Sequence, residues 1–235
     1  MGRPPSTTRP VGLFCGLAVV DVIQLVQAPP GPDDKIVALD QLIAAGGPAT
    51  NAAVAFAALG GRATLAAPVG AGPLAELVRA DLAGTGVELL DCSDCSDCSD
   101  RSGGSDGAGP APGLSVSSCT ITAGTGWRSV VSTNARAAVD TAPLDRYAAR
   151  AACGQEAPPD VVLIDGHNPA LARAALDLAA RAGALTVMDA GSWKDPAADL
   201  PARCDVVAAS ARFYPPGPAG PVTAPQDVAR HLLDA

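Results

Sequence analysis

The sequence has 235 residues, of which 48% are hydrophobic, and carries a formal net charge of -8 at pH 7. A chain of this length and composition can bury a core and forms one largish domain, or one domain with an appendage. The acidic balance and the lack of a basic cluster argue against nucleic acid as a partner. No run reaches the roughly 18 uncharged apolar residues that a membrane-spanning helix needs.

Cysteine usage points to a reducing compartment. Three of the seven cysteines lie in one short repeat and the others are scattered among apolar segments, so they form no secreted-type disulfide framework. The expected location is the cytoplasm. Leu13-Phe14-Cys15-Gly16 is not read as a lipoprotein cleavage site, because the apolar run follows Cys15 instead of preceding it.

The first strand is expected over 11–20, a mostly apolar run that ends at Asp21. Open α/β sheets bind ligands at the carboxyl ends of their strands, and an ionised carboxylate accepts hydrogen bonds from two neighbouring hydroxyls. Asp21 is therefore a candidate clamp for a polyol, with a solvated strand-exit carboxylate as the alternative. Residues 22–42 carry two short apolar-polar alternations around a proline-rich centre and predict a small hairpin-like flap.

The next segment, Gly46-Gly47-Pro48-Ala49-Thr50-Asn51, joins an apolar run to the alanine-rich residues 52–59, which favour a helix ending at a glycine pair. Two glycines without Cβ let a ligand approach the backbone, and a helix start offers free N–H groups. The side chain of Asn51 both donates and accepts hydrogen bonds. This corner suits a polyol, and the alternative is a glycine turn before a buried helix.

A second chemistry competes further along. A strand at 63–69 is followed by Gly70-Ala71-Gly72, a helix at 73–83 and a strand at 87–90 that ends at Asp91. This spacing matches a dinucleotide fingerprint, with a pyrophosphate on the helix start and a ribose on Asp91. Pro73 is equally explained as a first-turn helix residue. An NAD(P)-dependent Rossmann enzyme is therefore kept as a distant alternative.

Residues 91–113 are low in complexity. Cys92-Ser93-Asp94 is repeated twice, and Ser, Gly and Pro follow. Thiolates three residues apart can reach one soft metal ion, but a structural zinc site needs a fourth ligand and a partner knuckle, and neither is visible. The segment is expected to be a surface insertion that holds no metal.

The second half of the chain alternates strands and helices. Strands at 115–122 and 127–133 flank a Gly-rich turn and predict a hairpin. Further elements are expected as helices at 145–153, 169–182 and 225–233, and as strands at 161–164, 184–188 and 206–209. This alternation predicts a doubly wound, mostly parallel sheet with helices on both faces. His167 is interpreted as a loop residue, although its position would also allow ligand contact.

The residues from Gly46 to Ala53 resemble the first signature of the ribokinase/PfkB carbohydrate kinases, and Gly16 with Asp21 matches that family's opening strand. Segments at 82–87, 126–128, 165–167 and 187–191 follow in the family's order, so the resemblance covers nearly the whole chain. It implies a single, incomplete ribokinase-like α/β domain over residues 1–235. Small β lid segments would lie near 22–42 and 114–133, and the insertion at 91–113.

The resemblance also implies an activity: transfer of the ATP γ-phosphate, with Mg²⁺, to a hydroxyl of a small-molecule sugar or related alcohol. Carried over by position, four residues would hold substrate hydroxyls, namely Asp21, Gly46, Gly47 and Asn51. No catalytic or metal-binding residue is assigned. No nucleic acid or membrane partner is expected, and a homodimer is left open.

Two parts of the family pattern do not occur in the 235 residues. The second signature, Asp-Thr-x-Gly-Ala-Gly-Asp, supplies glycine N–H groups to the moving phosphoryl group and an Asp that takes the hydroxyl proton, and it is absent. Ser210-Ala211-Arg212-Phe213 stands where the family has Asn-x-x-Glu. We therefore expect a sugar kinase truncated before that signature and inactive as it stands, with a non-catalytic sugar-binding remnant as the alternative.

Overall fold

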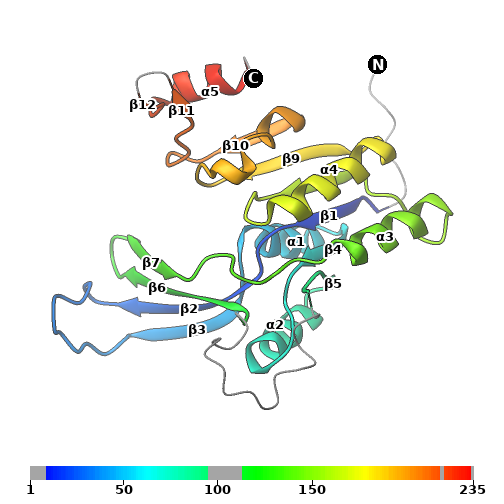
Figure 1. The fold of residues 1–235 in the computed structure, drawn as a ribbon. Coiled ribbons are helices and arrows are strands. Elements are labelled where there is room, and N and C mark those ends of the chain that lie inside the picture. Colours follow the sequence, from blue (N-terminus) through cyan, green and yellow to red (C-terminus); the bar gives the residue numbers. More distant parts are fainter. Residues whose placement is uncertain (1–8, 95–112, 218–219, 234–235) are drawn as a thin grey trace, which may run out of the picture.

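The computed structural model describes residues 9–94, 113–217 and 220–233. Its larger sheet has six parallel strands in the order β10-β9-β8-β1-β4-β5 (Figure 1). The strands are β1 Val11–Cys15, β4 Arg62–Ala67, β5 Val87–Asp91, β8 Val161–Ile164, β9 Leu185–Ala190 and β10 Val206–Ala209. The strand order reverses at β1, because β4 pairs with one of its edges and β8 with the other. Doubly wound sheets bind ligands at such a switch point.

Helices cover both faces of this sheet because the buried strands are apolar on both sides. Successive residues of a strand point to opposite faces, so Leu13 packs with α3 and α4 while Phe14 packs with α1 and α2. The helices are α1 Pro48–Ala58, α2 Pro73–Ala83, α3 Ala142–Ala152, α4 Pro169–Ala182 and α5 Pro225–Leu233. Two short 3-10 turns, Asp195–Ala197 and Pro201–Arg203, connect β9 to β10. The expected doubly wound α/β architecture is confirmed.

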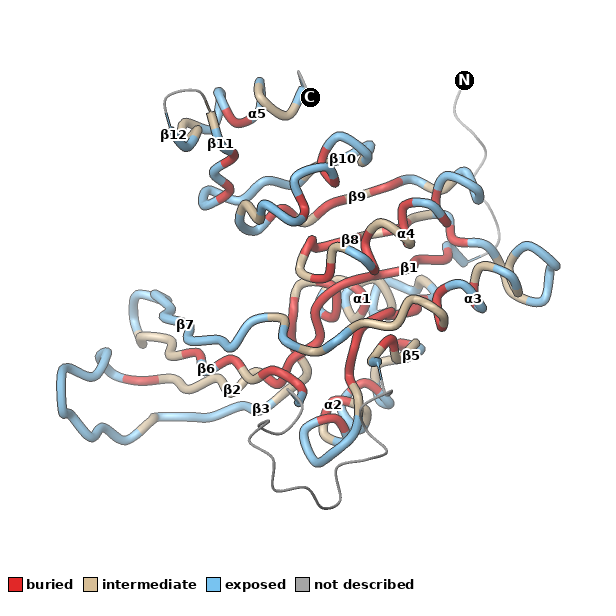
Figure 2. Tube along the Cα trace, in the orientation of Figure 1, coloured by how far each residue is buried: buried red, intermediate tan, exposed pale blue. Residues whose placement is uncertain are grey.

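A separate four-stranded sheet projects from the larger one in the order β3-β2-β6-β7 (Figure 1). Its strands are β2 Val19–Val26, β3 Asp40–Gly46, β6 Ser115–Thr122 and β7 Arg128–Ser132. The pair β2–β6 is parallel and the other two pairs are antiparallel. The far end of this sheet and the β2–β3 connection are exposed (Figure 2). A two-residue pair, β11 Pro216–Gly217 with β12 Gly220–Pro221, precedes α5.

The run 11–20 does not form one strand, and this prediction was wrong. The chain breaks at Gly16, so β1 ends before it and Asp21 is the third residue of β2 in the four-stranded sheet. A buried carboxylate lies against this break: a Cβ at Gly16 would overlap Asp165, which accepts a hydrogen bond from the Leu17 N–H at 2.7 Å. The run looks continuous in sequence because residues on both sides of the break are buried.

Other bounds differ as well: the helix expected at 145–153 is 142–152, and the strand expected at 184–188 is 185–190. The second strand of the flap expected at 22–42 extends beyond it, over 40–46, and residues 29–37 form an exposed connection. Helix α1 begins at Pro48 instead of residue 52, since proline suits the first helical turn. Asn51 therefore lies inside the first turn of α1. The helices at 73–83, 169–182 and 225–233 match their predicted bounds.

The start of the expected insertion belongs to the fold. Asp91 is the last residue of β5, and Cys92 is fully buried in the core. The Cys92 N–H donates to Ala67 O at 3.0 Å, and the Asp140 N–H donates to Cys92 O at 2.9 Å. Residues 91–94 are thus structural, whereas Cys95 and Cys98 lie outside the described residues. Within the described part of the chain, no helix is both long and apolar enough to span a bilayer.

Candidate functional site

A cavity of about 680 Å³ lies where the two sheets meet and is lined by residues from both. Three of the four predicted site residues line it, namely Asp21, Gly47 and Asn51. Gly46 adjoins it, because a Cβ at Gly46 would overlap the carboxylate of Asp21. The remaining lining residues are Leu17, Val19, Ile23, Pro48, Ala52, Ser117, Cys119, Ile121, Arg128, Val130 and Asp189.

Asp21 faces the cavity from the middle of the four-stranded sheet. It lies between Ala44 of β3 and Ser117 of β6 in the strand register. Burial raises the pKa of Asp21, while a hydrogen bond from Ser117 and the charge of Arg128 act in the opposite direction. The missing side chain of Gly46 gives this carboxylate its room. An acceptor-only group is thereby held at the cavity wall.

Gly47 fixes the entry to α1. Its φ of 106° lies in a region that other residues rarely adopt, and a Cβ there would overlap the carbonyl oxygen of Leu17. The helix start is less open than expected. Pro48 has no N–H, the Ala49 N–H donates to Asp165 at 3.3 Å, and the Asn51 N–H donates to Gly47 O at 2.9 Å. The exposed side chain of Asn51 is therefore the main polar group that α1 presents to the cavity.

Asp165 organises this region, and sequence reasoning did not assign it a role. Its side chain is 1% exposed and accepts hydrogen bonds from the N–H groups of Leu17, Ala49 and His167. These donors belong to the end of β1, the start of α1 and the end of β8. Asp165 thus joins three segments, two of which, at Leu17 and at α1, contribute residues to the cavity lining. An Asp directly after a buried strand was the available signal, and the same signal had been used for Asp21.

The carboxyl ends of β8 and β9 carry further titratable groups. Asp189 of β9 lines the cavity, and its pKa is raised by burial and by the nearby charge of Asp165. Burial lowers the pKa of His167 and that of Lys194. His167 is not part of the cavity lining, and its Nδ1 lies 2.8 Å from Asn134 Oδ1 on the segment that returns from β7.

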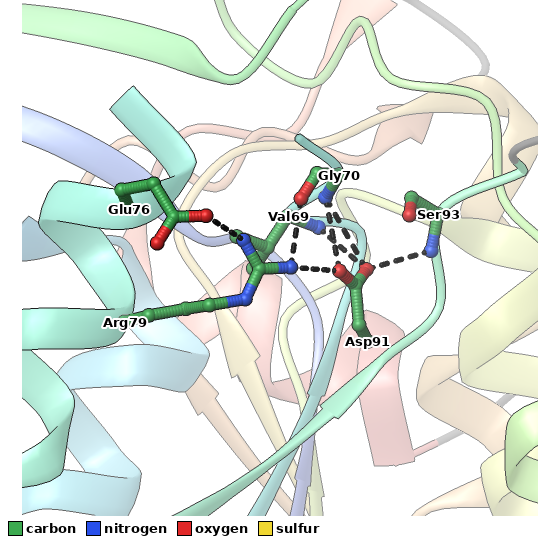
Figure 3. A network of polar contacts seen from close by, with 6 residues as sticks. All are labelled: Val69, Gly70, Glu76, Arg79, Asp91 and Ser93. Atoms are coloured by element: carbon green, nitrogen blue, oxygen red, sulfur yellow. Dashed lines mark hydrogen bonds and ion pairs between the residues drawn. The ribbon is translucent and has the colours of Figure 1, made fainter. Parts of the chain in front are cut away.

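The groups that would bind a dinucleotide form hydrogen bonds and an ion pair within the protein instead (Figure 3). Asp91 accepts hydrogen bonds from the N–H groups of Val69, Gly70 and Ser93. It also pairs with Arg79 at 2.5 Å, and Arg79 in turn donates to Gly70 O at 2.7 Å. Asp91 is thus engaged by the protein's own donors, and the Gly70 N–H points at a carboxylate. The arrangement does not favour a ribose on Asp91 or a pyrophosphate at Gly70.

A six-stranded parallel sheet whose order reverses at β1, together with a four-stranded sheet beside the ends of its strands, defines a ribokinase-like α/β fold. Solved structures share this fold. A ribokinase described as putative, from Agrobacterium tumefaciens, is 22% identical with a TM-score of 0.64, over 85% of this chain and 59% of that chain. A microbiome-derived acarbose kinase is 21% identical with a TM-score of 0.64, over 85% of this chain and 60% of that one.

Phosphofructokinase-2 from Escherichia coli is more distant, with 17% identity and a TM-score of 0.60 over 94% of this chain and 67% of that one. The chain thus spans about three fifths of the length of the first two structures. No protein-family model and no curated protein matches the sequence. At these identities the comparisons establish the fold.

Proposed function

We propose that the protein is a carbohydrate kinase of the ribokinase/PfkB type, and that these 235 residues hold its sugar-binding side. The observation that carries this proposal is the meeting of Asp21, Gly47 and Asn51 on one cavity between two sheets. The reaction is transfer of the ATP γ-phosphate to a hydroxyl of a sugar or related alcohol. The structural neighbours include a ribokinase, an acarbose kinase and a phosphofructokinase, so they do not define the substrate.

The roles follow from donor and acceptor chemistry. Asp21 accepts hydrogen bonds from two sugar hydroxyls, and charge-assisted bonds of this kind are roughly twice as strong as neutral ones. Asn51 donates to one hydroxyl and accepts from another. Gly46 and Gly47 keep the wall free of side chains, so the sugar reaches both groups. The four-stranded sheet is the lid in this proposal, because its strands β2, β6 and β7 contribute residues to the cavity lining.

The described residues do not identify a magnesium or triphosphate site. Among them, no group of three or more His, Cys, Asp or Glu side chains could hold a metal ion. At 210–213, the Ser210 hydroxyl donates to Gly191 O and accepts from the Arg212 N–H, so it serves a local turn. We therefore assign ATP and Mg²⁺ to the proposed reaction and to no residue of this chain.

Binding of a sugar at the cavity is the direct test. Isothermal titration of the purified chain with ribose, fructose, glucose and myo-inositol should give one site for at least one ligand. Asp21→Asn should weaken that binding by about tenfold or more, the equivalent of one charge-assisted hydrogen bond. Asp227→Asn is the control, because Asp227 pairs with Arg230 on exposed α5. Absence of binding, or equal loss in both variants, would contradict the proposal.

A non-catalytic sugar-binding protein is the second candidate. It is supported by the lack of a Gly-Ala-Gly-Asp run in the 235 residues. Sugar binding without phosphate transfer, under conditions where ATP and magnesium are saturating, would favour this candidate over the kinase.

A further inference from the structure

The charged groups that line the cavity are two carboxylates and one guanidinium, those of Asp21, Asp189 and Arg128. The carboxylates come from different sheets, Asp21 from β2 and Asp189 from β9. The charge of Arg128 lowers the pKa of Asp21, so the guanidinium lies within electrostatic range of that carboxylate. The lining is therefore net negative, and its acidic groups meet the ligand from two sides.

Burial and the charge of Asp165 raise the pKa of Asp189, and the charges of His167 and Lys194 act in the opposite direction. Among the described residues none donates a hydrogen bond to its carboxylate or pairs with it within 4.0 Å, and the Lys194 ammonium donates to Ser192 instead. Asp165 and Asp205 differ in this respect, because the first accepts three backbone N–H groups and the second accepts the N–H and hydroxyl of Thr186. A half-buried carboxylate without a protein donor, on a cavity wall, is open to donors from a ligand.

The four-stranded sheet adds an apolar surface to the same cavity. Ile23, Cys119 and Val130 are neighbours across β2, β6 and β7 in the strand register. They project on the same side of the sheet as Asp21 and Ser117, because residues two apart on a strand share a face. All three line the cavity, and Val130 is 49% exposed. A ligand that reaches this row covers it with an apolar group.

The cavity is large enough for a ligand with both a polar sugar head and an apolar substituent. A cavity of about 680 Å³ falls within the range of roughly 300–1,000 Å³ that holds drug-sized ligands. One sugar ring between the carboxylates therefore does not fill it.

We infer, on the basis of the proposed function, that Asp189 is a second ligand-binding carboxylate and that the cavity selects a sugar or cyclitol with an uncharged or amino-bearing head and an apolar substituent. The head lies between Asp21 and Asp189 and donates hydrogen bonds to both. The substituent lies on Ile23, Cys119 and Val130. A phosphate on the head meets two carboxylates and one guanidinium, that of Arg128, so the net charge of the lining disfavours it.

Matched sets of ligands test this inference by calorimetry. Each set contains a parent sugar, its phosphate ester and a derivative with an aromatic substituent: ribose, ribose 5-phosphate and adenosine; glucose, glucose 6-phosphate and p-nitrophenyl glucoside. In a set that binds, the aromatic derivative should bind about tenfold more tightly than the parent through burial of apolar area. The phosphate ester should bind at least about tenfold more weakly.

Variants separate the two halves of the cavity. Asp189→Asn should weaken binding of the parent sugar by about tenfold. It should also reduce the difference in affinity between the parent sugar and its phosphate ester. Val130→Ser should weaken binding of the aromatic derivative more than binding of the parent, so the ratio of their affinities falls. Asp227→Asn is again the control, and thermal melts establish that each variant is folded.

The outcomes separate this inference from the proposed function. If a phosphate ester binds more tightly than its parent, or if Asp189→Asn leaves the parent's affinity unchanged, the inference is overturned while a sugar site stands. The same holds if no aromatic derivative exceeds its parent. If no member of any set binds, the proposed function fails together with the inference.

Discussion

At the scale of single residues, two glycines allow a matched test of the cavity wall. Gly47 and Gly72 both precede a helix that begins with proline, and their φ values are 106° and 103°. A Cβ would overlap Leu17 O at Gly47 and would meet nothing within 4 Å at Gly72. Gly72→Ala should therefore cost only backbone strain, of order 1–3 kcal/mol. Gly47→Ala should cost clearly more, as measured by urea unfolding, and equal losses would show that Leu17 moves aside freely.

The carboxylate of Asp21 is expected to lower the stability of the folded chain at pH 7 and to strengthen sugar binding. Burial raises its pKa, so the folded chain binds this proton more tightly than the unfolded chain and stability falls as pH rises through the raised pKa. Asp21→Asn should therefore raise the melting temperature at pH 7 while it weakens sugar binding. The gain should vanish below the ordinary value of 3.8, where both states are protonated.

Asp205 is a control for which the pKa shift, and hence the effect on stability at pH 7, has the opposite direction. Hydrogen bonds from the N–H and hydroxyl of Thr186 lower its pKa, so its contribution is present at neutral pH and is lost as pH falls through that lowered pKa. Asp205→Asn should therefore lower the melting temperature at pH 7. Melts of both variants between pH 3 and 7 check the two signs, and changes in the same direction would contradict them.

The sequence identified some of these residues and missed others for a physical reason. Gly46, Gly47 and Asn51 share one short motif whose local geometry can be anticipated from glycine and proline chemistry. The role of Asp165 depends on donors that lie 2, 116 and 148 residues away in the chain. Contacts of that range are set by tertiary packing, which a local pattern does not encode.

At the scale of elements, the loop between β4 and α2 depends on Asp91. Removing its side chain leaves the N–H groups of Val69, Gly70 and Ser93 and the guanidinium of Arg79 without that acceptor (Figure 3). Asp91→Ala should lower the free energy of unfolding by roughly 3 kcal/mol or more, as partly buried donors are left unpaired. Denaturant titration measures this loss.

Glu76 supplies the comparison on the same network. It lies 3.7 Å from Arg79, and its side chain is 74% exposed. Exposed ion pairs contribute about 0–1 kcal/mol, so Glu76→Gln should be close to neutral. A loss as large as that of Asp91→Ala would mean that the Arg79 charge, and not the Asp91 acceptor, holds the loop.

Cys92 belongs to the sheet and not to the repeat that follows it. Burial raises the pKa of its thiol to about 12, so it stays protonated in the folded chain and is a poor metal ligand. Cys92→Ser buries a hydroxyl in the core and should cost roughly 1–3 kcal/mol. Cys153 is exposed, so Cys153→Ser should leave the free energy of unfolding unchanged. Stoichiometric zinc that is lost from Cys92→Ser would contradict this account.

Helices and strands were predicted correctly where the hydrophobic periodicity agreed with glycine and proline signals at their ends. The prediction failed where two buried strands follow each other without a polar residue between them. Helix α2 begins at a proline after glycine, and α4 has an amphipathic pattern, so both were located in the sequence. The break at Gly16 was missed because apolar residues continue into the next strand. As a result, Asp21 lies on an inner strand of the four-stranded sheet. A single strand over 11–20 would have put it at the end of the larger sheet instead.

At the scale of the whole molecule, alternating strands and helices were enough to predict a doubly wound sheet, because each strand–helix unit is local in sequence. The cavity was not predictable in the same way. It forms between two sheets whose strands come from both halves of the chain, with β2 beside β6 and β1 beside β8. Which side chains share that cavity, Asp189 among them, follows only from the packing of the two sheets.

The last prediction concerns the activity of the 235 residues as a unit: they should bind a sugar and transfer phosphate very slowly. A positioned general base contributes about 10²- to 10⁴-fold and a preorganised anion cradle about 10²- to 10³-fold. The two Gly-Ala-Gly runs, at 70–72 and 107–109, are followed by proline and not by aspartate. The Gly70 N–H is already bonded to Asp91. The Gly-Ala-Gly-Asp run that would supply both contributions does not occur in the 235 residues, so the rate should fall several orders of magnitude below that of an ordinary enzyme.

A coupled assay of ADP release, with magnesium and each sugar that binds, measures that rate. Background from a contaminating kinase is excluded if Asp21→Asn lowers the signal together with the sugar affinity, and is indicated if the signal is unchanged. Turnover of about 1 per second or more lies in the ordinary enzyme range. If Asp21→Asn abolished turnover at that level, a base among these residues would have to supply the chemistry, and Asp189 on the cavity wall would be the first to substitute.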